Sequence, residues 1–143
     1  GLAYRYETVI RIAQFIVQKR IPSEEYLLDL SSSDVEEILK GIKGIGPYTA
    51  RLALILALRK YDQPPVDRWL KKIVSKVYGV DEKRVESFWR EKWRDWSGLA
   101  SLALTITLDA EPLRKALARI ERGELTPIHE PDKLSPLNMW RYF

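Results

Sequence analysis

Two short stretches of the chain carry residue types that could do chemistry, and the first is a glycine-rich turn. Gly44-Ile45-Gly46 places two glycines two residues apart, and Pro47 follows where a new helix would begin. Such a turn at a helix N-terminus exposes backbone N–H groups at the positive end of the helix dipole, which favours a bound phosphate. Without a Cβ, glycine also lets another backbone come close. On its own, however, Gly-x-Gly is explained equally well as a plain corner between two helices.

The second stretch is Pro65-Val66-Asp67-Arg68-Trp69, one predicted helix further along the chain. Asp67 is placed to cap a helix that starts at Arg68, and taken alone this structural role explains it better than a chemical one. When Asp67 is considered together with a phosphate-binding turn, the chemical role explains it better than the structural one. A carboxylate held at a helix N-terminus would stabilise positive charge on a sugar whose glycosidic bond is breaking, and it could orient water.

The composition limits the chemistry that the chain can do. It has 143 residues, 45% hydrophobic and 31% charged, which predicts one globular domain without extensive disorder. With no cysteine and one histidine, disulfides, thiol catalysis, an iron–sulfur cluster and a site of several imidazoles are excluded. A net charge of +4 permits binding to nucleic acid, although 20 acidic residues among 24 basic ones make this weak support.

The chain shows no signal for a membrane or for secretion. The longest apolar-rich stretch, Leu99 to Leu108, is too short to span a bilayer and reads as a buried helix. The start of the sequence has no basic region followed by an apolar one, so no secretory signal is expected. We therefore expect an intracellular protein of the cytoplasm or nucleoid.

Hydrophobic periodicity predicts an all-α fold, with a helical domain over residues 1–123. A helix from Tyr6 to Val17 should bury one apolar face, and Pro22 should end it. Ser33, with Glu36 three residues later, should cap a helix that runs to Gly41. The helix after the glycine turn, to about residue 59, is almost wholly apolar and should be buried on most sides.

Later helices are predicted from similar signals. One should run from Arg68 to Tyr78 and end at Gly79, and the next should start at Asp81. Ser97 should cap an apolar helix, and Glu111-Pro112 should open a last helix that reaches Gly123. Residues 124–143 should form a tail packed on the surface. The tryptophans expected in the core are Trp89, Trp93 and Trp96.

At its two chemical stretches the chain resembles the helix-hairpin-helix DNA glycosylase superfamily. That group includes endonuclease III and the mismatch, 8-oxoguanine and 3-methyladenine glycosylases. Its pattern is a Gly-hydrophobic-Gly hairpin, a helix, and a loop with Val-Asp or a similar pair. Gly44-Ile45-Gly46 and Val66-Asp67 fill these places, within a hairpin over residues 41–50. The apolar flanks fit as well, and the resemblance covers roughly residues 2–110.

The resemblance implies roles for particular residues. Asp67 would be the catalytic carboxylate, and Tyr48 and Trp69 would line the pocket for the base, although a core role explains Trp69 better when it is taken alone. Arg68, Lys72 and Lys76 form a stripe that is either a phosphate track or a solvated face, and Arg51 could reach DNA or only solvate its helix. The residues expected to contact DNA are Lys43, Gly44, Ile45, Gly46, Tyr48, Thr49, Arg68 and Lys72.

Two departures from the family pattern matter. Members with strand-cleaving lyase activity carry a lysine two residues after the second hairpin glycine, where this chain has Tyr48. Without that amine no Schiff base forms, so the resemblance implies a monofunctional enzyme that leaves an abasic site. The chain also lacks the first helices of the family domain. A second chain would supply them, or the sequence is a fragment, or the pocket is built differently.

The function expected on these grounds is repair of double-stranded DNA. The enzyme would hydrolyse the N-glycosidic bond of a flipped damaged or mismatched base, without a cofactor, although the hairpin backbone could hold a monovalent or divalent cation. Tyr48 resembles thymine and uracil mismatch members, whereas Pro65-Val66-Asp67-x-Trp69 resembles 8-oxoguanine members, so the base stays open. The alternatives are a non-catalytic DNA-binding module, an accessory half of a split glycosylase, and an all-α module that binds proteins.

Overall fold

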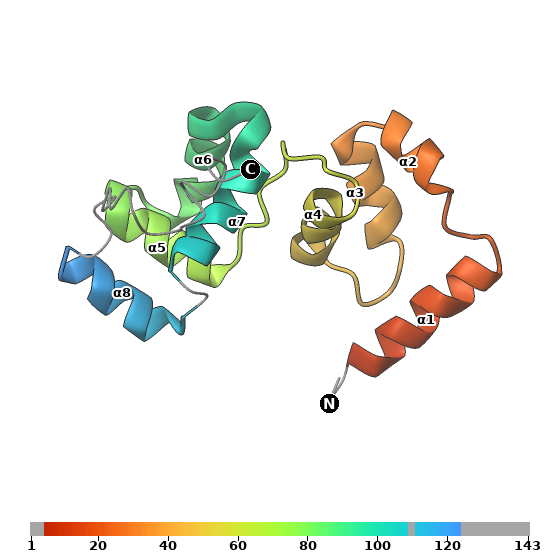
Figure 1. Ribbon diagram of the computed structural model, residues 1–143, viewed down its shortest axis with the longest axis horizontal. Coiled ribbons are helices and arrows are strands. Elements are labelled where there is room, and N and C mark those ends of the chain that lie inside the picture. The colour runs from red at the N-terminus through yellow and green to blue at the C-terminus, as the bar shows by residue number, and fades with distance from the viewer. Residues whose placement is uncertain (1–4, 109–110, 124–143) are drawn as a thin grey trace, which may run out of the picture.

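The computed structural model describes residues 5–108 and 111–123, and its helices fall into two groups joined by one loop (Figure 1). The described ranges contain no strand, so the all-α prediction is confirmed. The first group is α1 Tyr6–Val17, α2 Glu24–Asp29, α3 Ser32–Lys40 and α4 Pro47–Leu56. The second group is α5 Arg68–Tyr78, α6 Val85–Trp93, α7 Ser97–Thr107 and α8 Leu113–Glu121, with short 3-10 turns at Glu82–Arg84 and Arg94–Trp96.

In the first group, α2, α3 and α4 share one small core. Its buried side chains are Leu27, Val35, Leu54 and Leu58. The predicted cap at Ser33 is wrong, because Ser31, two residues earlier, has the extended backbone of a cap and its Oγ accepts from the Asp34 N–H at 3.2 Å. The helix α4 ends at Leu56, earlier than predicted, and Leu56 is two-thirds exposed, so α4 is not buried on most sides.

The second group packs around a larger core. Trp89 is fully buried, and its Nε1 donates to the carbonyl oxygen of Ser97 at 3.0 Å. Gly79 ends α5 as predicted, with the left-handed φ of 67° that glycine adopts without strain. Trp93 and Trp96 lie at the surface, so their prediction as core residues is wrong. The buried apolar side chains of these four helices include Leu70, Ile73, Val74, Val85, Trp89, Leu108 and Ala116.

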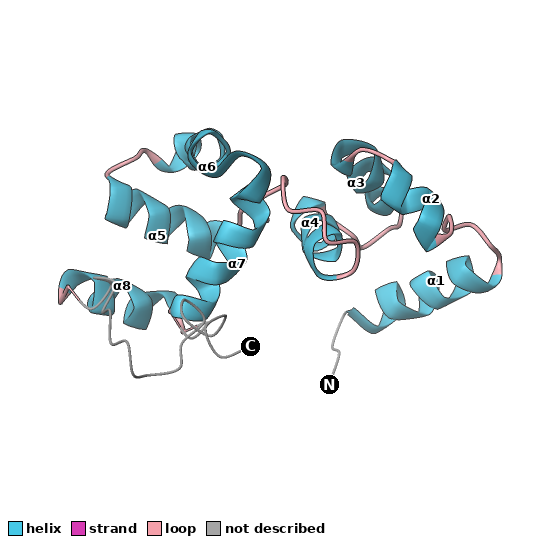
Figure 2. Ribbon diagram, turned by 45° about the horizontal axis from the view of Figure 1, so that its top comes forward, coloured by secondary structure: helices cyan, strands magenta, loops and turns pink. Residues whose placement is uncertain are grey.

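The loop between α4 and α5 lies tightly against the start of α7, and both views show it bridging the two groups (Figure 2). The Gly98 N–H donates to the carbonyl oxygen of Tyr61 at 2.6 Å, and a Cβ on Gly98 would lie 2.8 Å from that oxygen. Ser97 does not cap α7 as predicted; it is the first residue of the helix, and its Oγ donates to the Asp62 carbonyl oxygen at 2.9 Å. The loop ends in Pro64-Pro65, both buried, whose rings restrict the backbone.

The first helix forms over the predicted range, but the prediction that it buries an apolar face is wrong. No residue of α1 is buried, and Ile10, Ile16 and Val17 are 52%, 60% and 83% exposed. The periodicity correctly identified an apolar face, but no other part of the described chain packs over it. The helix touches the rest of its group at the hairpin, where Arg11 Nη1 donates to the carbonyl oxygen of Lys43 at 2.7 Å.

Within residues 5–108 and 111–123, no helix has the length and apolar character needed to cross a membrane. The predicted tail over residues 124–143 lies outside the described residues.

Candidate active site

The hairpin connects α3 to α4 through two glycines that differ in their surroundings. Gly44 has a φ of 102°, and a Cβ on it would overlap the side chain of Thr8 from α1. Gly46 precedes α4 with a φ of −96°, and a Cβ there would have no neighbour within 4 Å. The open space at the hairpin therefore lies at Gly46, whereas α1 occupies the space beside Gly44.

The hairpin residues expected to contact DNA are mostly at the surface. Lys43, Tyr48 and Thr49 are exposed, Ile45 is partly buried, and buried Ile42 anchors the turn in the core. Pro47 occupies the first turn of α4, and no side chain caps this helix. Backbone N–H groups at its N-terminus are thus available to an anion at the positive end of the helix dipole.

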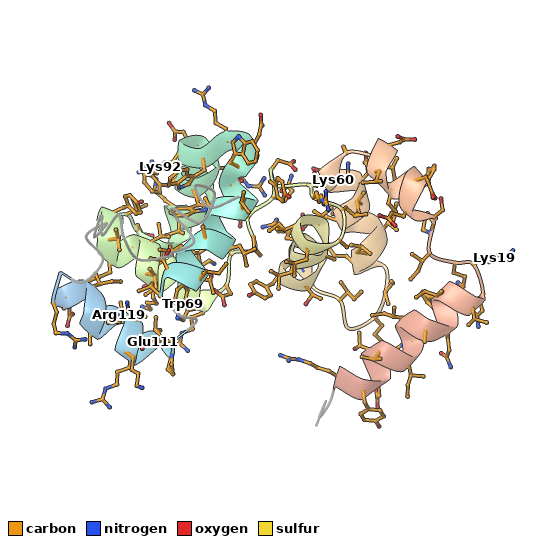
Figure 3. All side chains as sticks on the ribbon, viewed as in Figure 1. Lys19, Lys60, Trp69, Lys92, Glu111 and Arg119 are labelled. Atoms are coloured by element: carbon orange, nitrogen blue, oxygen red, sulfur yellow. The ribbon has the colours of Figure 1, made fainter. Side chains whose placement is uncertain are left out.

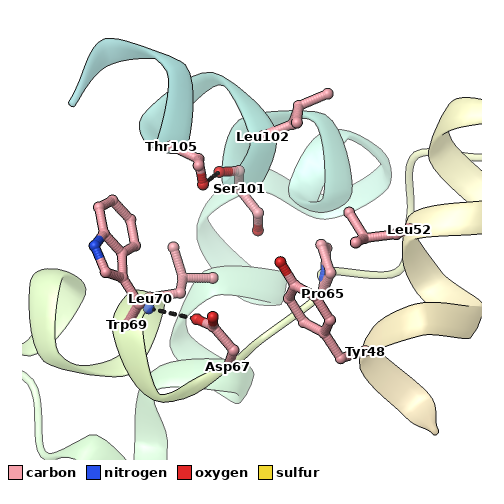
Figure 4. A pocket seen from close by; sticks show the side chains of 9 residues that line it. All are labelled: Tyr48, Leu52, Pro65, Asp67, Trp69, Leu70, Ser101, Leu102 and Thr105. Atoms are coloured by element: carbon pink, nitrogen blue, oxygen red, sulfur yellow. Dashed lines mark hydrogen bonds between the residues drawn. The ribbon is translucent and has the colours of Figure 1, made fainter. Parts of the chain in front are cut away.

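A cavity of about 240 Å³ lies between α4, the start of α5 and α7 (Figure 4). Its size is near the lower end of typical small-molecule sites, which suits one planar group rather than an extended ligand. The two groups of helices both contribute walls, so the cavity exists only where they meet. The lining residues are Tyr48, Leu52, Pro65, Asp67, Trp69, Leu70, Ser101, Leu102 and Thr105.

Asp67 combines the two roles that its sequence position left open. It caps α5, since its Oδ1 accepts from the Leu70 N–H at 2.7 Å, and the same carboxyl group lines the cavity. Its second oxygen, Oδ2, makes no hydrogen bond to the described residues and is open to a ligand. The cap fixes the direction of the side chain, because it ties one oxygen to the backbone.

Tyr48 reaches the same cavity from the first turn of α4, and its hydroxyl points towards α7 (Figure 4). Partial burial and the nearby negative charge of Asp67 raise the pKa of Tyr48 above its ordinary value of 10.0. The phenol is therefore protonated at neutral pH and can donate a hydrogen bond into the cavity.

The wall formed by α7 holds two polar residues that the sequence analysis missed. Ser101 Oγ donates to the Ser97 carbonyl oxygen at 2.9 Å, and Thr105 Oγ1 donates to the Ser101 carbonyl oxygen at 3.0 Å. Since each hydroxyl proton is used within the helix, the two hydroxyl oxygens on this wall of the cavity keep only acceptor capacity. Polar residues every four positions in an otherwise apolar helix were the signal that could have found them.

Trp69 closes one side of the cavity and also belongs to the core. Its Nε1 donates to the Glu111 carbonyl oxygen at 2.9 Å, which ties α5 to the segment before α8 (Figure 3). Its ring packs against the buried core of the second group, which includes Ile73, Leu108 and Ala116. The core and pocket interpretations of Trp69 therefore do not exclude each other.

Comparison with solved structures gives three with related folds. The 8-oxoguanine glycosylase/lyase of Clostridium acetobutylicum in its apo form is 30% identical over 68% of this chain and 35% of that one, with a TM-score of 0.60. A structure of MBOgg1 in complex with a low-affinity DNA ligand is 27% identical, over 69% of this chain and 35% of that one, with a TM-score of 0.63. This chain has the helix-hairpin-helix DNA glycosylase fold.

The clostridial enzyme in complex with double-stranded DNA, with cytosine opposite 8-oxoG, gives the third match. It is 25% identical over 85% of this chain and 39% of that chain, with a TM-score of 0.60. No protein-family model and no curated protein matches the sequence. The helix-hairpin-helix chain spans little more than a third of the length of the glycosylases that it matches.

The basic side chains of this helix-hairpin-helix chain differ in whether they already pair with an acidic side chain. Arg68, beside the catalytic candidate, is exposed. Lys72 is paired with Glu82, and Lys76 Nζ lies 3.1 Å from Glu121 Oε1, so two members of the predicted phosphate stripe already have acidic partners. The described residues hold no cluster of three acidic, histidine or cysteine side chains that could bind a metal ion.

Arg51 neither points to solvent nor lies on the hairpin surface. Its side chain is 14% exposed, with Nε 3.0 Å from Glu36 Oε2 and Nη1 2.9 Å from Glu86 Oε1. The same Nη1 donates to the Pro64 carbonyl oxygen at 3.1 Å. Burial opposes the charge, but the two carboxylates outweigh it and raise the pKa of Arg51. Glu36, expected to complete a capping box, is instead a buried ion-pair partner.

Proposed function

We propose that this chain is the carboxylate-bearing part of a DNA glycosylase that removes a damaged base from double-stranded DNA. The observation that carries the proposal is the position of Asp67. It caps α5 with one oxygen, lines a cavity with the same carboxyl group, and follows the hairpin by one helix. In the reaction, the open N-terminus of α4 binds backbone phosphate, and a flipped base enters the cavity.

The bond-breaking step then depends on charge. As the N-glycosidic bond breaks, positive charge develops on the sugar, and the fixed carboxylate of Asp67 stabilises it. Oδ2, which accepts no hydrogen bond from the described residues, would orient the water that attacks the sugar. Tyr48, protonated at neutral pH, can hydrogen-bond the base within the cavity. The products are the free base and an abasic site.

We propose that the reaction stops at the abasic site. The lyase reaction needs an amine that attacks the sugar, and no residue lining the cavity is a lysine. Tyr48 stands where lyase members of the superfamily carry that lysine. The clostridial neighbour is a glycosylase/lyase, so this chain would differ from it in the second chemical step.

For the base, 8-oxoguanine opposite cytosine is our first candidate. The structural neighbours are 8-oxoguanine glycosylases, and one binds DNA with that pair. The hydroxyl oxygens of Ser101 and Thr105 are acceptors. They suit a base edge that presents N–H groups, and oxidation of guanine at C8 adds such a group.

A second candidate, the accessory or incomplete half of a larger glycosylase, is favoured by α1. This helix exposes an apolar face, and the chain spans little more than a third of its neighbours' length. The remaining helices of a complete domain, in the same protein or in a second chain, would cover this face. In that case the chain would bind DNA but would need the rest of the domain for excision.

Single-turnover excision tests these proposals. Labelled duplexes carrying 8-oxoguanine opposite cytosine, uracil, thymine opposite guanine, or an alkylated purine are incubated with the chain and analysed with and without alkali. Breaks that appear only after alkali are expected. Breaks without alkali would contradict a monofunctional enzyme, and binding without any break would favour the accessory half.

The carboxylate is tested by Asp67→Asn, which keeps a capping side chain but removes the charge. Excision should fall by about 100-fold or more, with stability within about 1 kcal/mol of the parent. Asp81→Asn is the matched control, because Asp81 also caps a helical turn, accepting from the Lys83 N–H at 2.8 Å, but does not line the cavity. Equal excision by both variants would remove Asp67 from the mechanism.

A further inference from the structure

The cavity lies between two groups of helices, so its geometry depends on how those groups are held together. Tyr48 and Leu52 belong to α4, whereas Asp67, Trp69 and Ser101 belong to α5 and α7. A small rotation of one group against the other would move Tyr48 relative to Asp67. Some contact must therefore fix both groups close to the cavity.

Arg51 makes contacts of this kind from the same helix as Tyr48. Its guanidinium contacts Glu36 on α3 in the first group and Glu86 on α6 in the second. The planar fork of arginine suits several acceptors at once, which the single ammonium of lysine does not reproduce. Arg90 Nη2 also lies 3.1 Å from Glu86 Oε1, so the acidic partner is held from two sides.

The third acceptor of Arg51 lies in the short segment that carries the carboxylate of Asp67. Nη1 donates to the Pro64 carbonyl oxygen, three residues before Asp67, and Pro64 is fully buried. Two consecutive prolines leave the backbone between these points little freedom. The segment that carries Asp67 is thus fixed at one end by Arg51 and at the other by the Leu70 N–H.

We infer that Arg51 is a positioning residue, which sets the place of Asp67 in the cavity by tying α4 to both α6 and the Pro64 carbonyl. The inference rests on the proposed glycosylase function and extends it to a residue that touches neither substrate nor cavity. Loss of Arg51 should then slow bond breaking more than it weakens DNA binding. A misplacement of about 1 Å at a catalytic group can cost about 100-fold in rate.

The test compares Arg51→Met and Arg51→Lys with the parent chain. Single-turnover excision should fall about 100-fold for Arg51→Met and about 10-fold for Arg51→Lys, which keeps the charge but not the fork. The dissociation constant for a duplex with a tetrahydrofuran abasic analogue should stay within about 3-fold, since the hairpin is untouched. Glu121→Gln, which removes an ion pair between α5 and α8 far from the loop, is the control and should behave like the parent.

A readout that needs no activity separates this inference from the proposed function. Tyrosine labelled at 13Cζ is titrated by NMR, and Tyr48→Phe assigns its signal. Tyr48 should titrate above 10.0 in the parent and closer to that value in Arg51→Met and Arg51→Lys, because burial in the cavity and the charge of Asp67 together raise its pKa. If the parent excises no base, the glycosylase proposal fails while this titration still tests the positioning.

Two results would overturn the inference. The first is that neither the rate of excision nor the titration of Tyr48 differs between Arg51→Met and the parent. The other is a loss of excision that DNA binding matches in full, as general unfolding would give. Should Arg51→Met fail to fold, Glu86→Gln removes the contact with the second group alone and is judged by the same two readouts.

Discussion

Tyr48 and Asp67 line one cavity from different groups of helices, Tyr48 from the first turn of α4 and Asp67 from the residue that caps α5. Burial, together with the charge of Asp67, raises the pKa of Tyr48. A side chain at position 48 therefore lies close enough to the carboxylate of Asp67 to feel its charge. In the proposed reaction, position 48 is therefore the place where a substitution would change the outcome.

Tyr48→Lys should add a lyase step. The amine would occupy the position of the family lysine, within a cavity that already holds a carboxylate, and could form a Schiff base with an abasic sugar. Borohydride should trap a covalent complex with abasic DNA, visible on a denaturing gel. Tyr48→Phe is the control and should give no adduct. If Tyr48→Lys binds abasic DNA but is never trapped, position 48 does not reach the sugar.

Substitution of the two hairpin glycines should affect different properties, the stability of the chain at Gly44 and its DNA binding at Gly46. Gly44→Ala forces a side chain into a positive φ and against Thr8, so unfolding should become easier by about 1–3 kcal/mol. Gly46→Ala adds a methyl group in open space at a φ that any residue adopts, so stability should change by less than about 0.5 kcal/mol. Urea unfolding measures both.

The same pair of variants should behave differently with DNA. Gly46→Ala should weaken binding to a duplex several-fold in fluorescence anisotropy, because the added methyl group occupies the space that a DNA backbone would use. Unchanged affinity would mean that DNA does not approach the hairpin at Gly46.

The exposed face of α1 should contribute little to the stability of this chain. Ile10→Ala should change the free energy of unfolding by less than about 0.5 kcal/mol, because Ile10 is half exposed. Ile73→Ala, in the core of the second group, should cost about 2–5 kcal/mol. A cost at Ile10 that matches the cost at Ile73 would show that something covers α1 in solution. Dependence of that cost on protein concentration would identify self-association.

The ion pairs around Glu86 should make stability depend on pH in acid. Burial alone would raise the pKa of Glu86, but the hydrogen bonds and charges of Arg90 and Arg51 outweigh it and lower the pKa below 4.5. A lowered pKa means that the contribution to stability is present above about pH 4.5 and is lost as the pH falls through the folded value. Urea unfolding between pH 3 and 6 should show a shallower loss for Glu86→Gln than for the parent. Parallel curves would contradict this.

Local signals in the sequence were enough to predict much of the fold. Gly79 and Asp67 act through the backbone of their own helix ends, and α5 begins and ends beside them as predicted, whereas α1 ends at Val17, five residues before Pro22. Ser31, Ser32 and Ser33 are consecutive, so composition alone could not tell which of them caps α3. The face of α1 illustrates a different limit, because periodicity shows that a face is apolar but not whether its partner lies in the same chain.

The site could be predicted only in part. The hairpin and Asp67 belong to short motifs, whereas the cavity arises from helices far apart in the sequence. Arg51 contacts Glu86, 35 residues away, and no local pattern marks that contact. Ser101 and Thr105 do follow a sequence pattern, a polar residue every four positions, but the pattern does not show that this face of the helix lines a cavity.

The loop that lies against Gly98 also divides the chain into two consecutive cassettes. The hairpin comes before this loop, whereas Asp67 and the polar wall on α7 come at its end and after it. A chimera joined within Tyr61–Gln63 would therefore exchange one cassette without cutting through the other. Its requirements are few: a residue without a side chain at position 98, and an acidic side chain at position 86 to receive Arg51. On the proposed function, a single crossover in this loop would exchange Asp67 and the α7 wall of the cavity while keeping the hairpin and Tyr48.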